Sequence, residues 1–275
     1  MDNELVAQEP TIDLVREEMR ELASSVVDGA GNPTEPFGQY VFLPDEPQAE
    51  LARYVERTVF QKWFGNSPEL LDSEYKAYEA STVFLCIIDH QRRLPAGMAR
   101  MTLPAANGFK TLNDIEAVWK RPLAETLEAT GLDWDLGRVW DVLTIAVMDE
   151  YRGKATEGLL TLSILQFGTQ GPRLCGGRWT VTVMDLNVLR LVQEMVGTPY
   201  RLFPGVESIS YLDSPASVPV FADFDEWLPR LAIADPGLHE LIAEQSGIQG
   251  VMRGPAWAPV LRLAGVDPRP TLATR

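Results

Sequence analysis

The sequence predicts an α+β fold in which a mixed central sheet carries helices on both faces. Three observations predict it: a hairpin of apolar strands (82–88 and 96–103), a third apolar strand (139–147), and a largely apolar helix that leads to a fourth strand (178–184). A strand, a crossover helix and a neighbouring parallel strand make a βαβ unit, and an antiparallel hairpin beside this unit gives a mixed sheet. A helix that is apolar on nearly every face must be covered on several sides, as a helix packed on a sheet is.

The N-terminal elements are predicted to be helical. Residues 10–28 form an amphipathic helix, because apolar side chains recur at helical spacing from Ile12 to Val26. A loop with a short apolar run at 40–43 follows, and then a second amphipathic helix over 48–64.

The middle of the chain alternates strands and helices. Residues 89–93 form the turn of the hairpin, and short helices are expected at 112–119 and 123–129. The apolar helix covers 157–167, and a later helix ends at Gly197, a typical helix stop.

The pattern loosens toward the C-terminus. Residues 208–212 are strand-like, short helices are expected at 223–231 and 236–245, and the tail beyond Gly254 is rich in Pro and Gly. We therefore expect one domain over 1–275, with a core at about 38–212, the N-terminal helix at 10–28 and a C-terminal helical extension at about 213–275.

Composition limits the kinds of partner. The chain of 275 residues has a net charge of −15, and residues 1–80 alone hold 6 basic and 17 acidic side chains. This acidity disfavours DNA as a partner. No apolar run is long enough to span a bilayer and the acidic N-terminus is unlike a signal peptide, so we expect a cytoplasmic protein without a membrane partner. Cys86, Cys175, His90 and His239 lack the spacing of a metal site, so no metal is expected.

The segment from Trp140 to Leu160 differs from this acidic background. It has an apolar strand, then the basic turn Tyr151-Arg152-Gly153-Lys154, then an apolar helix. A turn with successive backbone N–H groups at a helix N-terminus is a ready-made anion site. The sequence therefore predicts a site for a phosphate-bearing ligand at this turn.

Two stretches resemble motifs of a known superfamily. The run Leu-Thr-Ile-Ala-Val-Met-Asp-Glu-Tyr-Arg-Gly-Lys (143–154) resembles the donor-binding motif of the GNAT superfamily of N-acetyltransferases, a strand followed by Tyr-Arg-Gly-Lys-Gly-x-Gly and a helix. Residues 187–197 resemble its second motif. Together the two cover about 138–203, and the resemblance implies a GNAT-like sheet that splays around a thioester donor.

Earlier segments resemble one branch of that superfamily, the acyl-homoserine-lactone and N-acyl-amino-acid synthases. They are Arg-Thr-Val-Phe at 57–60 with Trp63, the acidic segment 72–79, the strand 84–89, Ala-Arg-Met-Thr-Leu-Pro at 99–104, and Trp140-Asp141. On its central strand this branch has the pattern Trp-Glu-x-Ser-Arg. The Arg after the Ser is absent from this chain, which has Thr144 and Ile145 there. Synthesis of homoserine lactones in particular is therefore not expected.

The resemblance implies roles for individual residues. The catalytic candidates are Asp141, as a base acting directly or through water, with Glu74 and Arg100 positioning the acceptor or the acyl group. The residues that would hold the donor are Ile145, Ala146, Val147, Arg152, Gly153, Lys154, Ala155, Thr156, Gly158 and Asn187. The residues that would bind substrate are Arg57, Trp63, Trp140, Thr144 and Tyr200. The same side chains also have structural interpretations, in which Asp141 is a strand charge paired with Arg100 and the basic turn is merely solvated.

The donor motif is degenerate. Ala155 and Glu157 stand where the family has its later glycines, and Gln193 stands where it has a tyrosine that serves as general acid. On the expected helix, Glu157 would lie in the first turn and repel a diphosphate, by about 1 kcal/mol at 4 Å in water and about 4 kcal/mol at an effective dielectric of 20.

We therefore expect an acyltransferase that moves an acyl group from acyl-CoA or acyl-carrier protein to the amine of a small metabolite, with no tightly bound cofactor. Two alternatives remain at this point. The donor could be an aminoacyl-tRNA, as in some GNAT-like enzymes of natural-product biosynthesis, or the degenerate loop could leave a binding module without catalysis.

Overall fold

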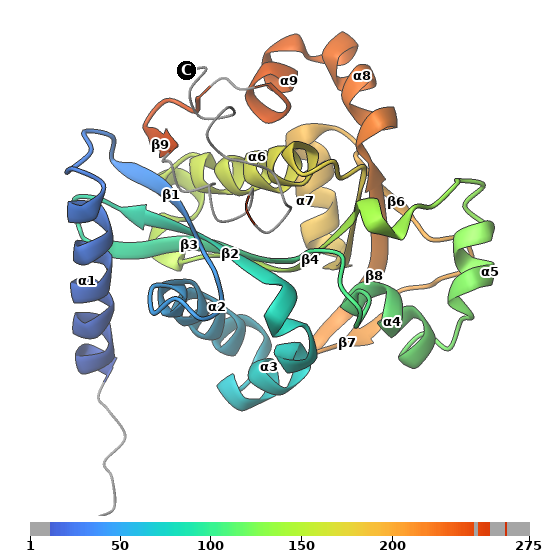
Figure 1. Ribbon diagram of the computed structural model, residues 1–275, viewed down its shortest axis with the longest axis horizontal. Coiled ribbons are helices and arrows are strands. Elements are labelled where there is room, and N and C mark those ends of the chain that lie inside the picture. The colour runs from blue at the N-terminus through green and yellow to red at the C-terminus, as the bar shows by residue number, and fades with distance from the viewer. Residues whose placement is uncertain (1–11, 245–246, 254–261, 263–275) are drawn as a thin grey trace, which may run out of the picture.

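The structure is a computed structural model that describes residues 12–244, 247–253 and 262. Over these residues the chain forms one mixed sheet of nine strands with helices on both faces (Figure 1), as the sequence predicts. The strands are β1 (Phe37–Phe42), β2 (Thr82–Asp89), β3 (Leu94–Thr102), β4 (Val139–Val147), β5 (Trp179–Asp185), β6 (Tyr200–Leu202), β7 (Ile209–Tyr211), β8 (Ser214–Asp223) and β9 (Val251–Arg253). The α-helices are α1 (Ile12–Gly29), α2 (Ala49–Phe64), α3 (Pro68–Tyr75), α4 (Lys110–Ala117), α5 (Leu123–Glu128), α6 (Leu159–Leu174), α7 (Leu186–Val196), α8 (Phe224–Ala234) and α9 (Pro236–Ile242).

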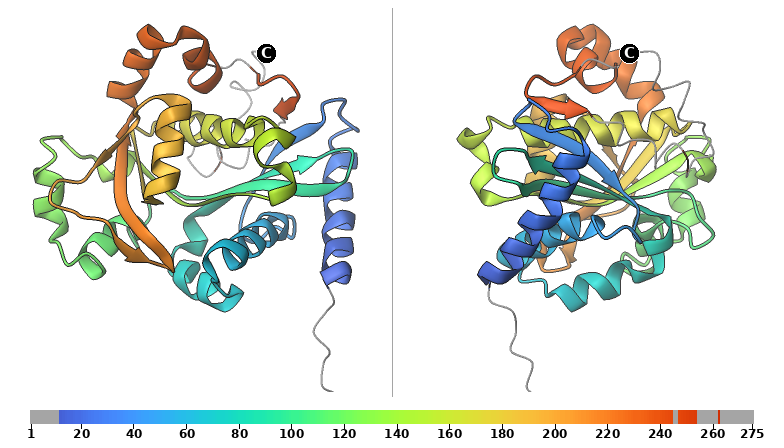
Figure 2. Two further views of the ribbon diagram at one scale, coloured as in Figure 1. Left: turned by 180° about the vertical axis from the view of Figure 1, so that it is seen from behind. Right: turned by 60° about the vertical axis from the view of Figure 1, so that its left-hand side comes forward.

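The strands follow the order β6-β8-β5-β4-β3-β2-β1-β9, and β7 pairs with β8. Helices α6, α7, α8 and α9 lie on one side of the sheet, and α2, α3 and α4 lie on the other (Figures 1 and 2). We call these the α6 face and the α2 face. In the described part of the chain, no helix combines the length and the apolarity that crossing a bilayer requires.

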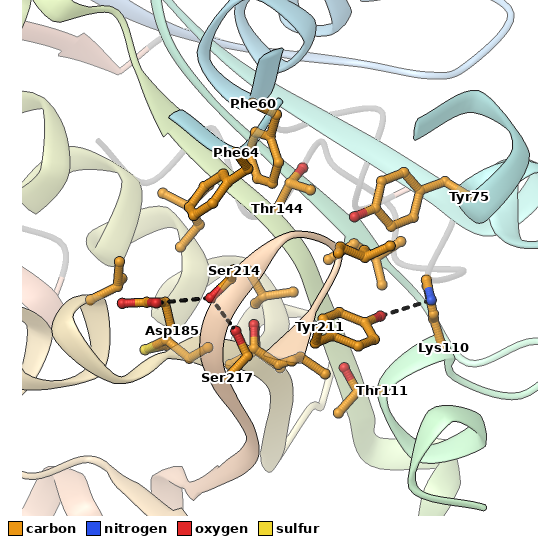
Figure 3. Close-up of a pocket in the computed structure, with 18 residues that line it drawn as sticks. Phe60, Phe64, Tyr75, Lys110, Thr111, Thr144, Asp185, Tyr211, Ser214 and Ser217 are labelled. Atoms are coloured by element: carbon orange, nitrogen blue, oxygen red, sulfur yellow. Dashed lines mark hydrogen bonds between the residues drawn. The ribbon is translucent and has the colours of Figure 1, made fainter. Parts of the chain in front are cut away.

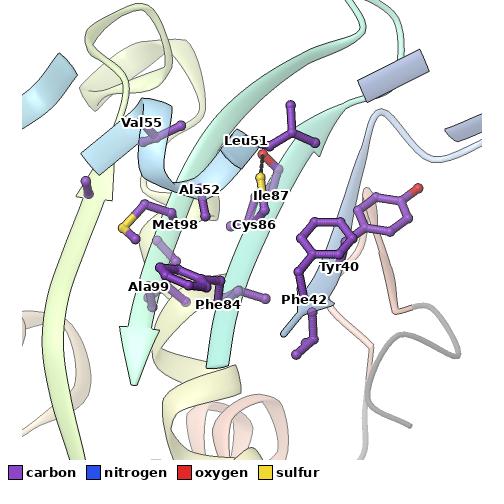
Figure 4. Packing of buried hydrophobic residues seen from close by; sticks show 14 of the residues in the cluster. Tyr40, Phe42, Leu51, Ala52, Val55, Phe84, Cys86, Ile87, Met98 and Ala99 are labelled. Carbon is purple, nitrogen blue, oxygen red and sulfur yellow. Dashed lines mark hydrogen bonds between the residues drawn. The ribbon is translucent and has the colours of Figure 1, made fainter. Parts of the chain in front are cut away.

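The α2 face has a close-packed core. Leu51, Ala52 and Val55 of α2 are fully buried against side chains of β2 and β3 such as Phe84 and Met98 (Figure 4). Burying one Leu or Val side chain stabilises a fold by about 1.5–3 kcal/mol. The packing of α2 on the sheet therefore fixes where the second half of this helix lies, and that half carries side chains of the site described below.

The expected βαβ unit is present as β4, α6 and β5, but its two strands soon separate. β4 and β5 are parallel and pair only over residues 139–141 and 179–181. Beyond this point β4 stays with β3 as far as Val147, while β5 stays with β8 as far as Asp185. The two halves of the sheet are thus joined where β4 and β5 pair, and they separate beyond that point to leave a V-shaped opening between these strands.

A β-bulge in β4 sets which side chains face this opening. Arg100 of β3 pairs with Thr144, whereas the next residue, Met101, pairs with Val142, so Leu143 is the extra residue. In a regular strand, residues three apart point to opposite faces. The bulge shifts this alternation by one, and Asp141 and Thr144 consequently both make side-chain contacts on the α2 face.

Helix α6 begins later than expected. The predicted helix at 157–167 is observed at Leu159–Leu174, preceded by short 3-10 turns at Asp149–Tyr151 and Gly153–Ala155. Glu157 and Gly158 both have left-handed backbone conformations, with φ of 50° and 80°. A residue with positive φ cannot belong to a right-handed helix, so Glu157 precedes α6 and does not lie in its first turn.

The C-terminal part also differs from the expectation. The segment expected to open a helical extension at 213 contains β8, a ten-residue strand in the middle of one half of the sheet. Helices α8 and α9 then follow close to the expected positions. Residues 1–11, and the tail from 254 except for Arg262, lie outside the described residues, so the expectations for them are not compared.

Candidate active site

A cavity of about 130 Å³ lies in the opening between β4 and β5, on the α2 face (Figure 3). Residues 142–145 of β4 and 182–185 of β5 form its two diverging walls. Helices α2, α3 and α4, the start of α7, and the β7–β8 hairpin supply the remaining lining. Of the sequence-predicted site residues, Thr144 and Ile145 line this cavity.

One side of the cavity is apolar. Phe60 and Phe64 of α2 form an aromatic pair, with ring centroids 5.5 Å apart, and Val188 of α7 and Leu212 complete this side. Leu212 belongs to the two-residue turn between β7 and β8, and Asn66 donates a hydrogen bond to its carbonyl oxygen at 3.2 Å. The hairpin that closes the cavity is therefore tied to the end of α2.

The opposite side is polar. It carries the hydroxyl groups of Tyr75, Thr111, Thr144 and Tyr211, together with the ammonium group of Lys110 (Figure 3). These side chains come from α3, α4, β4 and β7, elements that are distant in sequence.

Asp141 lies directly behind this polar side. Its carboxylate is fully buried and accepts two hydrogen bonds from Thr111, one from the backbone N–H at 2.8 Å and one from the hydroxyl at 2.7 Å. Burial raises the pKa of Asp141 to about 7, although the two Thr111 hydrogen bonds act to lower it. Asp141 does not line the cavity itself; its link to the cavity is the Thr111 side chain.

Arg100 is not a partner of Asp141. Its guanidinium group makes two hydrogen bonds to Glu56, at 3.0 and 2.6 Å, and a third to Glu79 at 2.8 Å. Burial acts to lower the pKa of Arg100, but the two carboxylates outweigh burial and raise it. Glu56 also accepts the hydroxyl proton of Thr144. Arg100 therefore lies behind the cavity wall, where it connects α2 to the sheet.

Glu74, like Arg100, does not line the cavity and belongs to a charged cluster. Lys110 donates to Asp114 at 2.7 Å and to the Tyr211 hydroxyl at 2.9 Å, and it forms an ion pair with Glu74 at 2.9 Å. Tyr211 in turn donates its proton to Asp114. The three protons of the Lys110 ammonium are thus taken up by groups of the protein, which makes Lys110 an unsuitable anchor for an anionic ligand.

A chain of hydroxyl groups lies across the cavity from Lys110. Ser217 donates to Ser214 at 2.8 Å, and Ser214 donates to the Asp185 carboxylate at 2.8 Å (Figure 3). The other oxygen of Asp185 accepts from the backbone N–H of Asn187 and caps α7. The side chain of Asn187 is exposed in the first turn of this helix.

The predicted donor turn lies between β4 and α6. It is held by the Arg152 guanidinium, which donates to the carbonyl oxygen of Val147 at 2.7 Å, and by the Thr156 hydroxyl, which donates to the carbonyl oxygen of Tyr151 at 2.7 Å. Gly153 has a φ of 58°, and it, Lys154 and Ala155 are exposed. At the start of α6 the N–H of Leu159 donates to the carbonyl oxygen of Thr156, and the N–H of Leu162 donates to that of Gly158, both at 2.9 Å. The prediction of an anion site therefore depends on the remaining N–H groups of this first turn.

Trp63 lies beside this turn. Its indole N–H donates to Asp149 at 3.0 Å, and the Arg152 guanidinium lies 5.0 Å from its ring centroid. The Trp63 side chain is 56% exposed. An exposed indole next to a basic turn forms a flat surface on which an aromatic group of a phosphate-bearing ligand can stack.

The remaining predicted residues lie elsewhere. Ala146 and Val147 are buried in β4 opposite Met98 and Gly97 of β3. Arg57 forms ion pairs with Glu50 and Asp72 outside the cavity. Trp140 lies in a hollow with Cys175, away from the V-shaped opening. Tyr200 lines a separate cavity of about 30 Å³.

The sequence reasoning missed Tyr75, Lys110, Thr111 and Tyr211, and it missed the hydroxyl chain from Ser217 to Asp185. Tyr75 lies within the acidic segment that carried part of the resemblance, which is the one signal that could have singled it out. The others stand in no recognisable motif.

The fold has counterparts among solved structures. No protein-family model and no curated protein sequence matches the chain. Among solved structures, it is similar to BjaI, a CoA-dependent acyl-homoserine lactone synthase solved with SAM and isopentyl-CoA. The two are 15% identical, the match covers 83% of this chain and 98% of that chain, and the TM-score is 0.51. It is also similar to FeeM, an N-acyl amino acid synthase from uncultured soil microbes, with 11% identity, 73% and 98% covered, and a TM-score of 0.50.

These likenesses show the fold. The chain has the same fold as BjaI and FeeM, which is the kind of fold that the resemblance in the sequence predicts.

Proposed function

We propose that the protein is an acyltransferase that moves an acyl group from a carrier thioester, acyl-CoA or an acyl-carrier protein, to the amine of a small molecule. The observation that carries this proposal is the parting of β4 and β5 around a cavity whose polar side leads, through Thr111, to the buried carboxylate of Asp141. The likeness in fold to BjaI, named as a CoA-dependent acyl-homoserine lactone synthase, and to FeeM, named as an N-acyl amino acid synthase, supports it.

In this proposal the donor arm lies along the free edge of β4. Past residue 141 the N–H and C=O groups that β4 directs away from β3 no longer meet β5. They are available to the amide groups of an extended donor, and Ile145 marks this position on the cavity wall. The diphosphate of a CoA donor would then meet the turn from Arg152 to Gly158 at the positive end of α6.

The amine would bind at the polar side, near the oxygens of Thr111 and Thr144. Its nitrogen attacks the thioester carbonyl carbon, and its proton passes to the Thr111 oxygen as the Thr111 hydroxyl proton passes to Asp141. The C–S bond then breaks, the carbonyl re-forms, and the thiolate leaves with the bonding pair. Asp141 gives up its proton through the Thr111 hydroxyl, and the thiolate takes up a proton. Amine and thioester become amide and thiol, with atoms and charge balanced.

The charge of the donor turn favours a compact donor over a large polyanion. Residues 149–158 contain two basic side chains, Arg152 and Lys154, and three acidic ones, Asp149, Glu150 and Glu157. A transfer RNA binds through many phosphate contacts to Lys and Arg, which this turn does not offer.

Calorimetry with acetyl-CoA, octanoyl-CoA and free CoA tests the proposal, followed by thiol release with a panel of amines. We expect at least one CoA species to bind and an amine-dependent release of thiol. The Asp141→Asn variant should lose this release, and Asp133→Asn, which changes an exposed carboxylate outside the cavity, should keep it. A salt titration separates the donors, because binding of an aminoacyl-tRNA weakens steeply with ionic strength. If neither CoA, acyl-carrier protein nor tRNA binds, the acyltransferase proposal is wrong.

A further inference from the structure

Of the four hydroxyls on the polar side of the cavity, only that of Tyr75 donates its proton to no group in the described residues. Its side chain is 3% exposed, and its hydroxyl points into the cavity (Figure 3). Among the described residues no hydrogen-bond partner is found for this hydroxyl. Because this hydroxyl opens onto the cavity, a group of a bound ligand can serve as its hydrogen-bond partner.

The other three hydroxyls on this side are committed to carboxylates. Thr111 donates to Asp141, Thr144 donates to Glu56, and Tyr211 donates to Asp114. The Thr111 and Thr144 oxygens can still accept a hydrogen bond, although their own protons are in use. The Tyr211 oxygen already accepts one from Lys110. The polar side therefore offers acceptors for the N–H groups of an amine, and Tyr75 supplies a donor.

Two cations hold the Tyr75 ring in place. The Arg100 guanidinium carbon lies 4.8 Å from the ring centroid, and the Lys110 ammonium nitrogen lies 6.0 Å from it. Both cations are themselves fixed, Arg100 by Glu56 and Glu79 and Lys110 by Glu74 and Asp114. The two charged clusters behind the cavity thus meet at this ring, and a phenylalanine would fill the same space.

We propose that Tyr75 is a catalytic residue whose hydroxyl donates a hydrogen bond to the oxyanion that forms on the thioester carbonyl during acyl transfer. This inference rests on the proposed function. When the amine nitrogen bonds to the carbonyl carbon, the π pair moves to the oxygen, and the Tyr75 O–H meets this negative charge. When the C–S bond breaks, the pair returns to the carbonyl, and Tyr75 has kept its proton throughout.

The electrostatics of Tyr75 fit this role. Burial raises the pKa of Tyr75, and Glu56 raises it further, while Arg100 lowers it. The phenol is therefore neutral at physiological pH and serves as a hydrogen-bond donor. A donor fixed in advance beside the developing charge requires no reorganisation when the reaction occurs.

The test compares Tyr75→Phe with the matched variant Tyr78→Phe. Tyr78 follows three residues later, and its hydroxyl accepts from Asn113 at 2.9 Å outside the cavity. Using the CoA thioester that the wild type turns over, we expect Tyr75→Phe to lower kcat by about 100-fold, the loss typical of one oxyanion donor. Donor affinity, measured by calorimetry, and thermal unfolding should change little, and Tyr78→Phe should keep kcat within about two-fold of the wild type, since it removes no oxyanion donor.

Each result decides between the two proposals. If the wild type turns over and Tyr75→Phe keeps its kcat, the role of Tyr75 is wrong and the acyltransferase proposal stands. If Tyr78→Phe loses as much kcat as Tyr75→Phe, or if Tyr75→Phe loses donor affinity in proportion to activity, the oxyanion role is likewise overturned. If the wild type turns over no thioester, both proposals fail.

Discussion

Thr111 holds both carboxylate oxygens of Asp141, one through its hydroxyl at 2.7 Å and the other through its backbone N–H at 2.8 Å. Asp141 is fully buried in β4, whereas Thr111 opens α4 and lines the cavity. A buried carboxylate with a pKa raised to about 7 is thereby connected to a cavity through a single hydroxyl group. Two pH-dependent properties follow from this connection.

The first is the pH dependence of acyl transfer. Below pH 7 Asp141 is mostly protonated and cannot accept a proton, so kcat/KM should rise with pH through an apparent pKa of about 7. Asp141→Asn should lower kcat/KM by about 100-fold or more and remove this titration, since a general base contributes about 10²–10⁴-fold. Thr111→Val should cause a comparable loss, because it breaks the link to the cavity while leaving the carboxylate in place.

Initial rates between pH 5 and pH 9 measure this profile. If Thr111→Val keeps full activity and the same titration, protons do not travel through Thr111. If Asp141→Asn keeps the titration, some other group is the base.

The second property is stability. The pKa of Asp141 is about 7 in the folded protein and 3.8 without burial. Between these values the folded state binds more protons than the unfolded state, so this residue's contribution to the free energy of unfolding is largest below pH 4 and falls as pH rises toward 7. The loss is about 1.4 kcal/mol for each pKa unit, and Asp141→Asn should abolish it.

Urea unfolding of wild type and Asp141→Asn from pH 4 to pH 8 isolates this effect. The comparison is needed because His90 acts in the opposite direction: burial lowers its pKa, which makes the folded state more stable as pH rises through this range. The contribution of His90 is the same in both proteins, so it cancels when their free energies of unfolding are subtracted at each pH. A difference that does not change with pH would mean that Asp141 does not titrate in this window.

The sequence predicts the part of the site that one continuous segment builds. The strand that carries Asp141 and Thr144, the basic turn and the helix after it are adjacent in sequence. The apolar residues of the strand and the helix predict both elements, and both are present in the structure. The bulge at Leu143, which brings Asp141 and Thr144 to one face, is not visible in that pattern, because it arises from the pairing with β3.

The rest of the site is assembled by long-range packing. Tyr75, Thr111 and Tyr211 come from three elements whose contacts with β4 no local pattern encodes. The sequence does not predict β8, because Pro215 and Pro219 interrupt its strand pattern. Pro219 lies opposite Val183 of β5, and on the other edge of β8 it falls between the stretches that pair with β6 and β7. On that second edge no neighbouring strand requires its missing N–H.

A third prediction concerns the buried ion pair between Arg100 and Glu56. Their side chains are 2% and 1% exposed, with a nitrogen–oxygen distance of 2.6 Å. Removing one partner leaves the other charge buried without compensation, which costs about 3–5 kcal/mol. Arg100→Met should therefore lower the free energy of unfolding by that amount.

Arg230→Met is the matched control for this loss. Arg230 pairs with Glu226 on the surface, and the two side chains are 59% and 40% exposed. Exposed pairs contribute about 0–1 kcal/mol, so urea unfolding should show little change. Equal effects of the two substitutions would contradict the buried role of Arg100.

A fourth prediction separates backbone strain from charge at Glu157. This residue is exposed and has a φ of 50° just before α6, a conformation that costs a residue with a side chain about 1–2 kcal/mol and costs glycine much less. Glu157→Gly should raise the free energy of unfolding by up to about 1 kcal/mol, whereas Glu157→Gln should leave it unchanged.

Both substitutions remove the negative charge, and both should tighten CoA binding if the diphosphate meets this turn. Repulsion between unit charges at 4 Å in water is about 1 kcal/mol, which corresponds to about a five-fold change in Kd. Calorimetry at low and high salt measures the change, and the gain should shrink as salt screens the charge. If CoA binds equally to the wild type and both variants, its diphosphate lies away from Glu157, and the turn before α6 does not hold the donor in the way proposed.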